Sequence, residues 1–358
     1  MPGVYISYPF CAQKCTYCNF ASGVFPRQLE GEYNLALQDE MKSHEWAWRP
    51  ETLYLGGGTP SLLDAVPPLP WQEYAEATME AAPGTITSER IATWRAAGIN
   101  RASLGVQSFV QEELARTGRK HTPAMVAEEV ARLRAAGLPN INLDLIAGLA
   151  GQTRESWRES LDWIARLNPP HVSVYIFEVD EDSRLGREML LGGVRYGASD
   201  VPAEALTVEL YETAVERLSQ LGIERYEISN FAKPGFESRH NLKYWQLEPY
   251  AGFGADAHSF DGRLRWQNVE AAGDYVARWR AGASVREEQI EADAATERFF
   301  VGLRLMRGIE PTGEEWTRWA APIARFMDAG LLARDGLRLK LTPRGVLLSN
   351  EVFQEFLA

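Results

Sequence analysis

The sequence predicts an α/β fold: a partial (β/α)6 TIM-like barrel followed by a smaller α+β domain that is winged-helix-like. Six short apolar strands alternate with helices between Gly3 and Phe177, which is the pattern of a parallel sheet covered by helices. Six units rather than eight indicate a barrel that stays partly open. From Glu297 the order changes to helix, helix, strand and helix. A chain of 358 residues has room for two domains, which we expect at 1–235 and 236–358.

The first three strand–helix units precede Gly98. The segment Leu29–Trp46 has apolar residues at helical spacing among acidic ones, as an amphipathic helix does. A second helix over Ser88–Ala97 begins behind the cap residue Thr87 and stops at Gly98. The expected strands are Gly3–Tyr8, Thr52–Leu55 and Ala75–Met79.

The next three units follow the same order. Thr122 and Pro123 form a cap and a first helical position, so a helix should begin there and end at Gly137. A short helical piece should precede it, ending near Arg116. The other expected elements are the strands Arg101–Gly105, Asn140–Leu145 and Val172–Phe177 and the helices Arg154–Leu167 and Ala203–Leu221.

Composition and charge limit the class of protein. A content of 45% hydrophobic and 24% charged residues is that of a globular protein. The net charge of -12 should repel nucleic acid, and the sequence has no basic patch that would offset it. Neither a run of 18 apolar residues nor a signal peptide is visible. We therefore expect a cytoplasmic protein without a transmembrane segment.

All three cysteines lie in one short stretch, Cys11, Cys15 and Cys18, with the spacing C-x3-C-x2-C. Thiolates select zinc, copper(I) or iron–sulfur clusters, and an odd count argues against a disulfide framework. A structural zinc would need a fourth ligand, for which His44 and His121 are the nearest histidines. A cubane cluster could instead use three cysteines and leave one iron open. Three unrelated core cysteines would normally be scattered along the chain.

Polar residues and glycines lie at or after the carboxyl ends of five of the expected strands. Cys11 comes after the first strand and three glycines after the second, and then come Glu80, Gln107 and Asp144. The carboxyl ends of parallel strands meet at one edge of a barrel, so these residues should share one pocket. A purely structural explanation accounts for the glycines as turn residues, but it leaves Asp144 as a costly carboxylate inside an apolar run.

The cysteine motif, with the aromatic Tyr17 before its last cysteine, resembles the radical S-adenosylmethionine superfamily. The stretches GGGTP, RASLGVQSF and INLDLIAGLAGQT place the resemblance in the oxygen-independent coproporphyrinogen III oxidase-like group, over nearly the whole chain. The resemblance implies a [4Fe–4S] cluster on Cys11, Cys15 and Cys18. It also implies that the open iron holds S-adenosylmethionine, whose sulfonium is split by an electron from the cluster.

The same resemblance implies which residues form the cofactor site. Tyr5 would contact the nucleoside, and the backbone at Tyr17 would lie near the adenine. Glycines let a backbone approach the methionine end of the cofactor closely, as a Cβ would not. No catalytic residue is assigned. The implied cofactor-binding residues are Tyr5, Tyr17, Gly57, Gly58, Thr59, Glu80, Gln107, Arg119 and Asp144.

Two features distinguish subfamilies within this group. The oxidase subfamily has a fourth cysteine where this chain has Phe20, and a longer segment before the first cysteine. The segment HNLKYW matches the HNxxYW motif of the heme chaperone HemW subfamily. The resemblance implies heme contacts by His240, Asn241, Tyr244 and Trp245, because imidazole is a common ligand of heme iron. A hydrogen-bonded core histidine is the ordinary alternative, and His258 is a second candidate ligand.

The chain departs from the family pattern at four places. Members usually have His, Asp, Asn and Pro where Ser7, Asn19, Ala82 and Ala150 stand. The segment between Thr59 and Glu80 is also short and rich in proline, so it should close its unit as a loop rather than a helix. Cluster binding should be unaffected, whereas the fine positioning of S-adenosylmethionine depends on these residues.

The resemblance implies a heme chaperone that binds heme and passes it to acceptor proteins, with a flavodoxin or ferredoxin as electron donor. Two other functions stay open. One is that of an enzyme, coproporphyrinogen III oxidase, which removes CO2 from propionate side chains by radical chemistry. The other is that of a zinc-stabilised binding protein with a winged-helix tail. Whether the chain is an enzyme is thus left undecided by its sequence.

Overall fold

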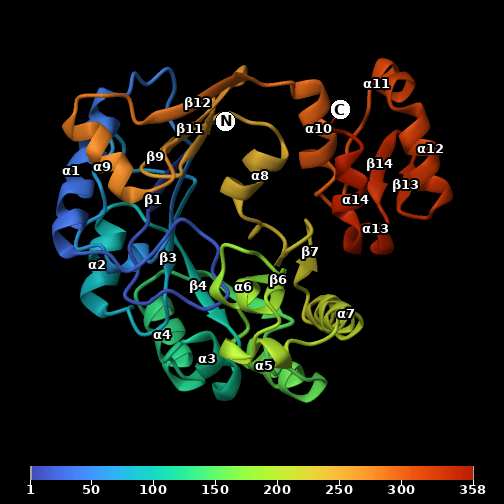
Figure 1. Cartoon of the computed structure of the whole chain (residues 1–358), viewed down its shortest axis with the longest axis horizontal. Coiled ribbons are helices and arrows are strands. Elements are labelled where there is room, and N and C mark those ends of the chain that lie inside the picture. The colour runs from blue at the N-terminus through green and yellow to red at the C-terminus, as the bar shows by residue number, and fades with distance from the viewer. Residues whose placement is uncertain (1, 358) are drawn as a thin grey trace.

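The computed structural model describes residues 2–357 and confirms an α/β barrel that is partly open. Across these residues one twelve-stranded sheet has the order β12-β11-β10-β9-β1-β2-β3-β4-β5-β6-β8-β7. Neighbours from β1 to β6 pair in parallel, and they curve around the centre of the molecule (Figure 1). Their bounds are β1 Gly3–Tyr8, β2 Thr52–Gly57, β3 Glu76–Ala81, β4 Arg101–Gln107, β5 Asn140–Ala147 and β6 His171–Ile176.

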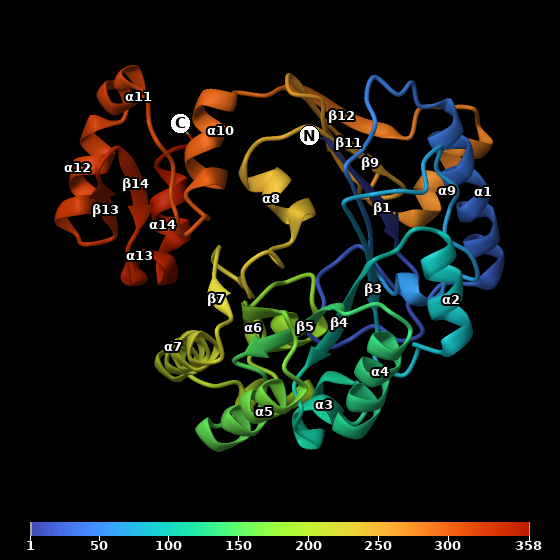
Figure 2. The same cartoon turned by 180° about the vertical axis from the view of Figure 1, so that it is seen from behind.

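Helices cover the outer face of the barrel, as Figure 2 shows from behind. The caps Thr87 and Thr122 accept hydrogen bonds from the first turns of their helices, as the sequence predicted. The first helix ends three residues earlier than expected, and the segment before β3 is a loop with one short 3-10 turn, η1 Pro60–Leu62. The helices are α1 Arg27–Ser43, α2 Ser88–Ala96, α3 Gln111–Thr117, α4 Pro123–Ala135, α5 Arg154–Leu167 and α7 Glu204–Gln220.

The two faces of the barrel strands differ in polarity. On β4 and β5 the residues Ala102, Leu104, Ile141 and Leu143 are fully buried in the core that the helices cover. The residues between them are polar, and in the parallel register they form rows on the inner face, such as Ser103 beside Asn142. Since side chains alternate across a strand, the barrel has an apolar outside and a polar interior.

The sheet extends beyond the six barrel strands at both edges, which the sequence did not predict. At one edge β9 Tyr250–Phe253 pairs in parallel with β1, and β10 His258–Phe260, β11 Leu264–Asn268 and β12 Arg286–Glu291 follow as antiparallel neighbours. At the other edge lie β8 Asn230–Ala232 and β7 Glu224–Arg225. The domain boundary after residue 235 stays a prediction, while the sheet itself continues to Glu291.

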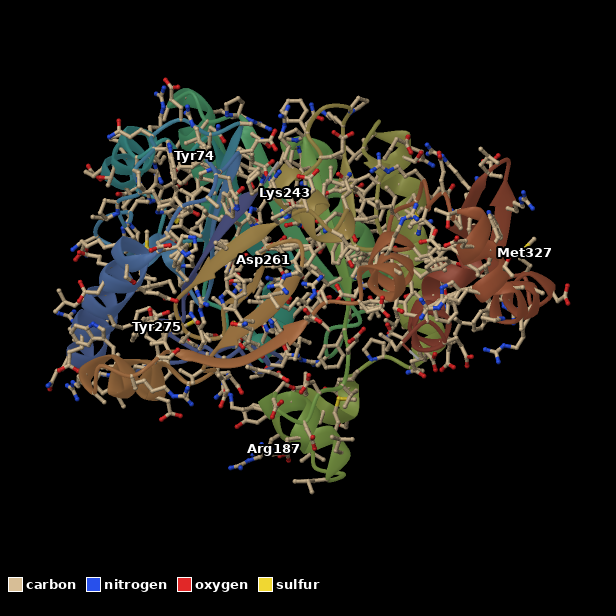
Figure 3. The ribbon with its side chains drawn as sticks, turned by 90° about the horizontal axis from the view of Figure 1, so that it is seen from above. Tyr74, Arg187, Lys243, Asp261, Tyr275 and Met327 are labelled. Atoms are coloured by element: carbon tan, nitrogen blue, oxygen red, sulfur yellow. The ribbon has the colours of Figure 1, made fainter. Side chains whose placement is uncertain are left out.

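Two helices accompany these additions. The helix α9 Ala272–Arg280 packs against α1, where Tyr275 donates a hydrogen bond of 2.5 Å to the carboxylate of Glu40. The helix α8 Arg239–Trp245 lies inside the open side of the barrel (Figure 1). In the view from above its Lys243 is near the centre of the molecule (Figure 3).

The C-terminal unit has the helices and the hairpin of a winged-helix-like domain. The expected single strand is a hairpin, β13 Leu332–Asp335 and β14 Arg338–Leu341, and the helix α11 Gly313–Arg318 was not predicted. The unit lies on the open side of the barrel beside α8 and β7 (Figures 1 and 2), and Met306 donates a backbone hydrogen bond to Tyr226. The other helices are α10 Ala294–Gly302, α12 Ala320–Asp328, α13 Pro343–Leu347 and α14 Ser349–Gln354.

A further segment without a predicted element projects from the body of the molecule. It carries α6 Arg184–Leu190 and the 3-10 turn η2 Arg195–Asp200, and Arg187 marks it in Figure 3. Separately, no helix in residues 2–357 is both long enough and apolar enough to cross a membrane.

Candidate functional site

The three cysteines lie in an irregular loop between β1 and α1, at the carboxyl edge of the barrel. The Cys11 N–H donates to the Gly23 carbonyl at 2.8 Å, which brings the far end of the loop back beside β1. Thr16 binds backbone atoms of α3 and of α6, at 3.2 Å to Thr117 and 2.8 Å to Leu185. All three thiols are free and partly exposed. The fold thus presents the cysteines on one anchored loop.

The sequence allows two kinds of metal site at the cysteines, a single zinc ion and a cubane iron–sulfur cluster. Within residues 2–357 no three His, Cys, Asp or Glu side chains are grouped as a single metal ion requires. His44 packs against Trp46 and Phe253 instead, and burial lowers the pKa of His121 to about 4. In a cubane each cysteine binds a different iron, so the cysteines do not have to converge on one point. The donor set of three free thiols on one loop fits a cubane.

The glycine turn after β2 packs directly on the start of the cysteine loop. Gly58 donates to the Tyr8 carbonyl at 2.7 Å, and Thr59 donates to the Phe10 carbonyl at 2.9 Å. A Cβ on Gly58 would lie 3.0 Å from the Cys11 sulfur and still closer to backbone atoms of residues 9 and 10. Gly57 has a φ of 109°, which side chains rarely adopt. These glycines therefore allow the turn to approach the cysteines.

Glu80, near the carboxyl end of β3, lies beside the glycine turn. Its carboxylate accepts a hydrogen bond of 2.7 Å from the Tyr54 hydroxyl and one of 3.2 Å from the Gly57 N–H. Burial raises the pKa of Glu80 to about 7, and these two hydrogen bonds oppose the rise. A nearby carboxylate, Asp144, also raises this pKa, while Arg101 lowers it. Near neutral pH this carboxyl group therefore exists in both protonation states.

Asp144, on β5, has hydrogen-bond partners. The Asn142 amide donates to it at 2.7 Å, and Ser173 also stabilises its charged form, although burial still raises its pKa. The carboxylate that a purely structural explanation would leave without a partner is therefore hydrogen bonded. Glu80 and Asp144 both line a polar cavity of about 20 Å³, which has room for one water molecule. Its lining is Tyr54, Glu80, Arg101, Ser103, Asn142, Asp144, Ser173, Tyr175, Asn230 and Asn241.

Gln107 and Arg119 complete the edge on the side of β4. Arg119 donates to the Gly105 carbonyl at 2.6 Å, and two of its nitrogens donate to the Tyr17 hydroxyl at 3.0 and 3.2 Å. This links the cysteine loop to β4. Gln107 has a φ of 70°, and its side-chain oxygen is buried without a hydrogen-bond partner among the described residues. Such a strained residue with an open acceptor is typical of ligand sites.

The HNLKYW segment is at the opposite edge of the barrel. It forms α8, whose backbone N–H groups at Arg239 and His240 donate to Glu76, the first residue of β3. The His240 ring is 1% exposed, and its two nitrogens are hydrogen bonded to Thr52 and Tyr244, each at 2.8 Å. Heme coordination by His240 stays a prediction, and it would require one of these hydrogen bonds to break.

The other residues of this segment point in different directions. Tyr244 packs edge-on against Tyr250 at 4.7 Å, and the Arg304 guanidinium lies 4.5 Å from the centre of the Trp245 ring. Trp245 thus contacts the C-terminal unit, whereas Asn241 lines the polar cavity. Their heme contacts stay predictions too.

His258 differs from His240 in its surroundings. It begins β10 and is exposed, and its ring makes no hydrogen bond to any described residue. The antiparallel register that pairs Phe260 with Tyr250 places His258 beside Gly252, the β9 partner of Tyr5. His258 is therefore an accessible imidazole on the sheet extension that adjoins β1.

The sequence reasoning missed the residues that line the barrel interior. Tyr54, Arg101, Asn142, Ser173 and Tyr175 surround the polar cavity with Glu80 and Asp144. The sequence contains a signal for this lining, because these strands alternate polar and apolar residues although helices cover their outer face. A strand buried on both faces reads as continuously apolar, so the alternation indicates a polar lumen.

Comparisons with known proteins agree with this fold. Residues 5–164 match the radical SAM superfamily, and residues 291–348 match the HemN C-terminal domain. The solved structure of coproporphyrinogen III oxidase (HemN) from Escherichia coli aligns with a TM-score of 0.83 over 99% of this chain and 90% of that one, at 21% identity. The fold and the cysteine loop define a radical S-adenosylmethionine superfamily protein.

Relatives of known name match the chain along its whole length. Heme chaperone HemW of Lactococcus lactis is 33% identical over 99% of this chain and 96% of that protein. Heme chaperone HemW of Bacillus subtilis is 34% identical over 100% of this chain and 99% of that protein. The chain belongs to the HemW family.

Proposed function

We propose that this protein binds heme and transfers it to acceptor proteins, with the help of a [4Fe–4S] cluster and S-adenosylmethionine. The observation that carries the proposal is the match to heme chaperones over nearly the full length of both chains. The barrel, the three-cysteine loop and the C-terminal unit are all included in that match. We further propose a cytoplasmic location and a flavodoxin or ferredoxin as electron donor.

The residues at the carboxyl edge would hold the cluster and the cofactor. Cys11, Cys15 and Cys18 would bind three irons, and the bound cluster would supply an open iron and an electron. The partly exposed carboxylate of Glu80 would attract the positively charged end of S-adenosylmethionine. Room for that end is left by the glycine turn, where a Cβ would collide. Gln107 ends β4 at this edge, and its unpaired oxygen is an acceptor for a ligand N–H or O–H. Tyr5 lies within β1, stacked on Tyr54, and would contact the nucleoside.

For the heme iron we propose His258 as the ligand. Its support is exposure and the absence of a hydrogen bond to any described residue, whereas His240 has two hydrogen bonds and is buried. In the antiparallel register His258 lies beside Gly252, and Gly252 pairs with Tyr5 on β1. Heme binding by the HNLKYW residues is the competing proposal.

One experiment tests the function and the ligand together. Anaerobically reconstituted protein would be titrated with heme while the heme absorption spectrum is recorded, and a parallel sample would receive coproporphyrinogen III, dithionite and S-adenosylmethionine. We expect a bound-heme spectrum and no protoporphyrinogen. His258→Ala should weaken heme binding about tenfold or more, with His44→Ala as control. Protoporphyrinogen formation without heme binding would favour the oxidase, and an effect of His240→Ala alone would favour the HNLKYW site.

The pKa of Glu80 predicts how cofactor binding depends on pH. Because its pKa is about 7, the carboxylate forms as the pH rises, and the carboxylate is the form that attracts a cation. The affinity for S-adenosylmethionine should therefore increase, by roughly tenfold between about pH 6 and pH 8. The titratable and charged groups that face Glu80 are Tyr5, Tyr54, Arg101, Asp144, Tyr175 and Tyr244.

Equilibrium dialysis against labelled S-adenosylmethionine at several pH values would measure this dependence. Glu80→Gln is the control, since a neutral amide cannot titrate, and its affinity should be weak and nearly constant over the same range. A wild-type profile as flat as that of Glu80→Gln would show that Glu80 does not bind the cofactor's charged end.

A further inference from the structure

The helix α8 is fastened to the amino edge of the barrel by buried groups. The carboxylate of Glu76, which is 3% exposed, accepts from the backbone N–H groups of Arg239 and His240 at 3.1 and 3.0 Å. It also accepts from the hydroxyl of the cap residue Ser238 at 3.3 Å. A carboxylate at a helix amino terminus is favourable, so the position of α8 relative to β3 is well defined.

This attachment fixes the ring of His240 in one orientation. The hydroxyls of Thr52 and Tyr244 occupy its two nitrogens. Its face stacks on the Tyr54 ring, with centroids 5.2 Å apart and an angle of 29° between the planes. Burial lowers the pKa of His240 to about 3, so the ring stays neutral and can accept from one hydroxyl while it donates to the other.

Tyr54 connects His240 with Glu80 at the carboxyl edge of the barrel. It also stacks on Tyr5, at 6.1 Å between ring centroids and an angle of 23°. The Tyr54 ring therefore has aromatic neighbours at two positions, which limits its rotation. Its hydroxyl donates to Glu80 at 2.7 Å, and the second oxygen of Glu80 accepts from Gly57 in the glycine turn. Contacts thus run continuously from α8 to the carboxylate at the cofactor edge.

We infer that His240 is a positioning residue for the cofactor site, which holds Tyr54 in the orientation that donates to Glu80. The inference rests on the proposed binding of S-adenosylmethionine at Glu80. It gives the HNLKYW segment a role that needs no iron ligation. Because coupling between two sites is reciprocal, cofactor binding at Glu80 in turn stabilises α8 in its place.

Two single variants, the double variant that combines them and one control variant test the inference by binding rather than by turnover. Tyr54→Phe removes only the hydroxyl and keeps the stacking, while His240→Gln removes the stacked ring and keeps polar atoms for Thr52. Tyr74→Phe is the matched control, because its hydroxyl binds a backbone carbonyl remote from Glu80, that of Trp71. Affinity for S-adenosylmethionine would be measured with cluster-loaded protein between about pH 6 and pH 8, together with heme titration and thermal unfolding.

For Tyr54→Phe we expect about tenfold weaker binding at pH 7 and a binding profile moved to higher pH, because Glu80 loses a hydrogen bond to its charged form. His240→Gln should have a smaller effect in the same direction. The double variant should lose less affinity than the two single effects combined, since both act through one hydroxyl. The Tyr74→Phe profile should match the wild type.

The outcomes separate this inference from the proposed function. If wild-type protein binds S-adenosylmethionine while Tyr54→Phe leaves affinity and pH profile unchanged, the inference is overturned and the proposed cofactor site stands. If wild-type protein does not bind the cofactor, the proposed binding of S-adenosylmethionine is contradicted, and the inference, which rests on it, is contradicted as well. Loss of heme binding in His240→Gln with unchanged cofactor binding would also overturn the inference. Should His240→Gln not fold, Tyr54→Phe alone still decides.

Discussion

Replacing any one of Cys11, Cys15 and Cys18 with serine is expected to abolish the iron–sulfur cluster. The chain has only these three thiols, and thiolate is the ligand that such clusters require. With one thiol missing, two irons of the proposed cluster would lack a protein ligand, because three cysteines already leave one of its four irons open. Iron and acid-labile sulfide after anaerobic reconstitution should fall from about four atoms per chain to fewer than about one.

Ser22→Ala is the control for this experiment. The Ser22 hydroxyl lies 3.9 Å from the Cys18 sulfur, so its loss changes the same loop without removing a ligand, and full iron content should remain. Zinc without sulfide in the wild-type protein would contradict the cluster and favour the zinc-stabilised protein. Unchanged iron in all three serine variants would exclude the loop as the site.

The second large effect is expected for Gly58→Ala. A Cβ at this position would lie 2.7 Å from the Phe10 carbonyl oxygen and 2.8 Å from the Pro9 carbonyl carbon. These are backbone atoms and cannot rotate away, so the turn must move from the cysteine loop. Overpacking of this kind costs about 1–3 kcal/mol. We expect lower stability in urea unfolding together with at least about tenfold weaker binding of S-adenosylmethionine.

Gly31→Ala is a matched control, because nothing lies within 4 Å of its ideal Cβ. It is in the helix α1, where alanine should stabilise the protein by about 0.5–1 kcal/mol and leave cluster and cofactor binding unchanged. Equal behaviour of the two alanine variants would show that the glycine turn does not need its close approach to the cysteines.

The sequence predicted the parts of the site that depend on local order. Cys11, Cys15 and Cys18 are close in the chain, so their spacing alone indicates a shared ligand. The strands were recognisable as short apolar runs, and the helix caps Thr87 and Thr122 act within one turn. The carboxyl-edge residues followed from a rule of parallel barrels, which needs only the strand order.

Prediction was weaker where pairing joins distant segments. The strands from β9 to β12 are short and irregular in pattern, and β9 becomes a strand because it pairs with β1, at the other end of the sequence. The hairpin β13–β14 differs from the single strand that the sequence predicts, because Gly336, with a φ of 62°, turns the chain back on itself. Asn19 is a further case, since its amide donates to Asp180 at 2.6 Å, and an aspartate at position 19 would place its carboxylate against that of Asp180.

The sequence by itself determined the class of fold, the cysteine loop and the glycine turn, because each depends on residues that are neighbours in the chain. Only the tertiary structure decided that His240 is buried at the amino edge and hydrogen bonded at both nitrogens, while His258 is exposed on the sheet extension. A histidine has the same chemistry in either place. Its role depends on which partners the packing of distant elements brings to its two nitrogens.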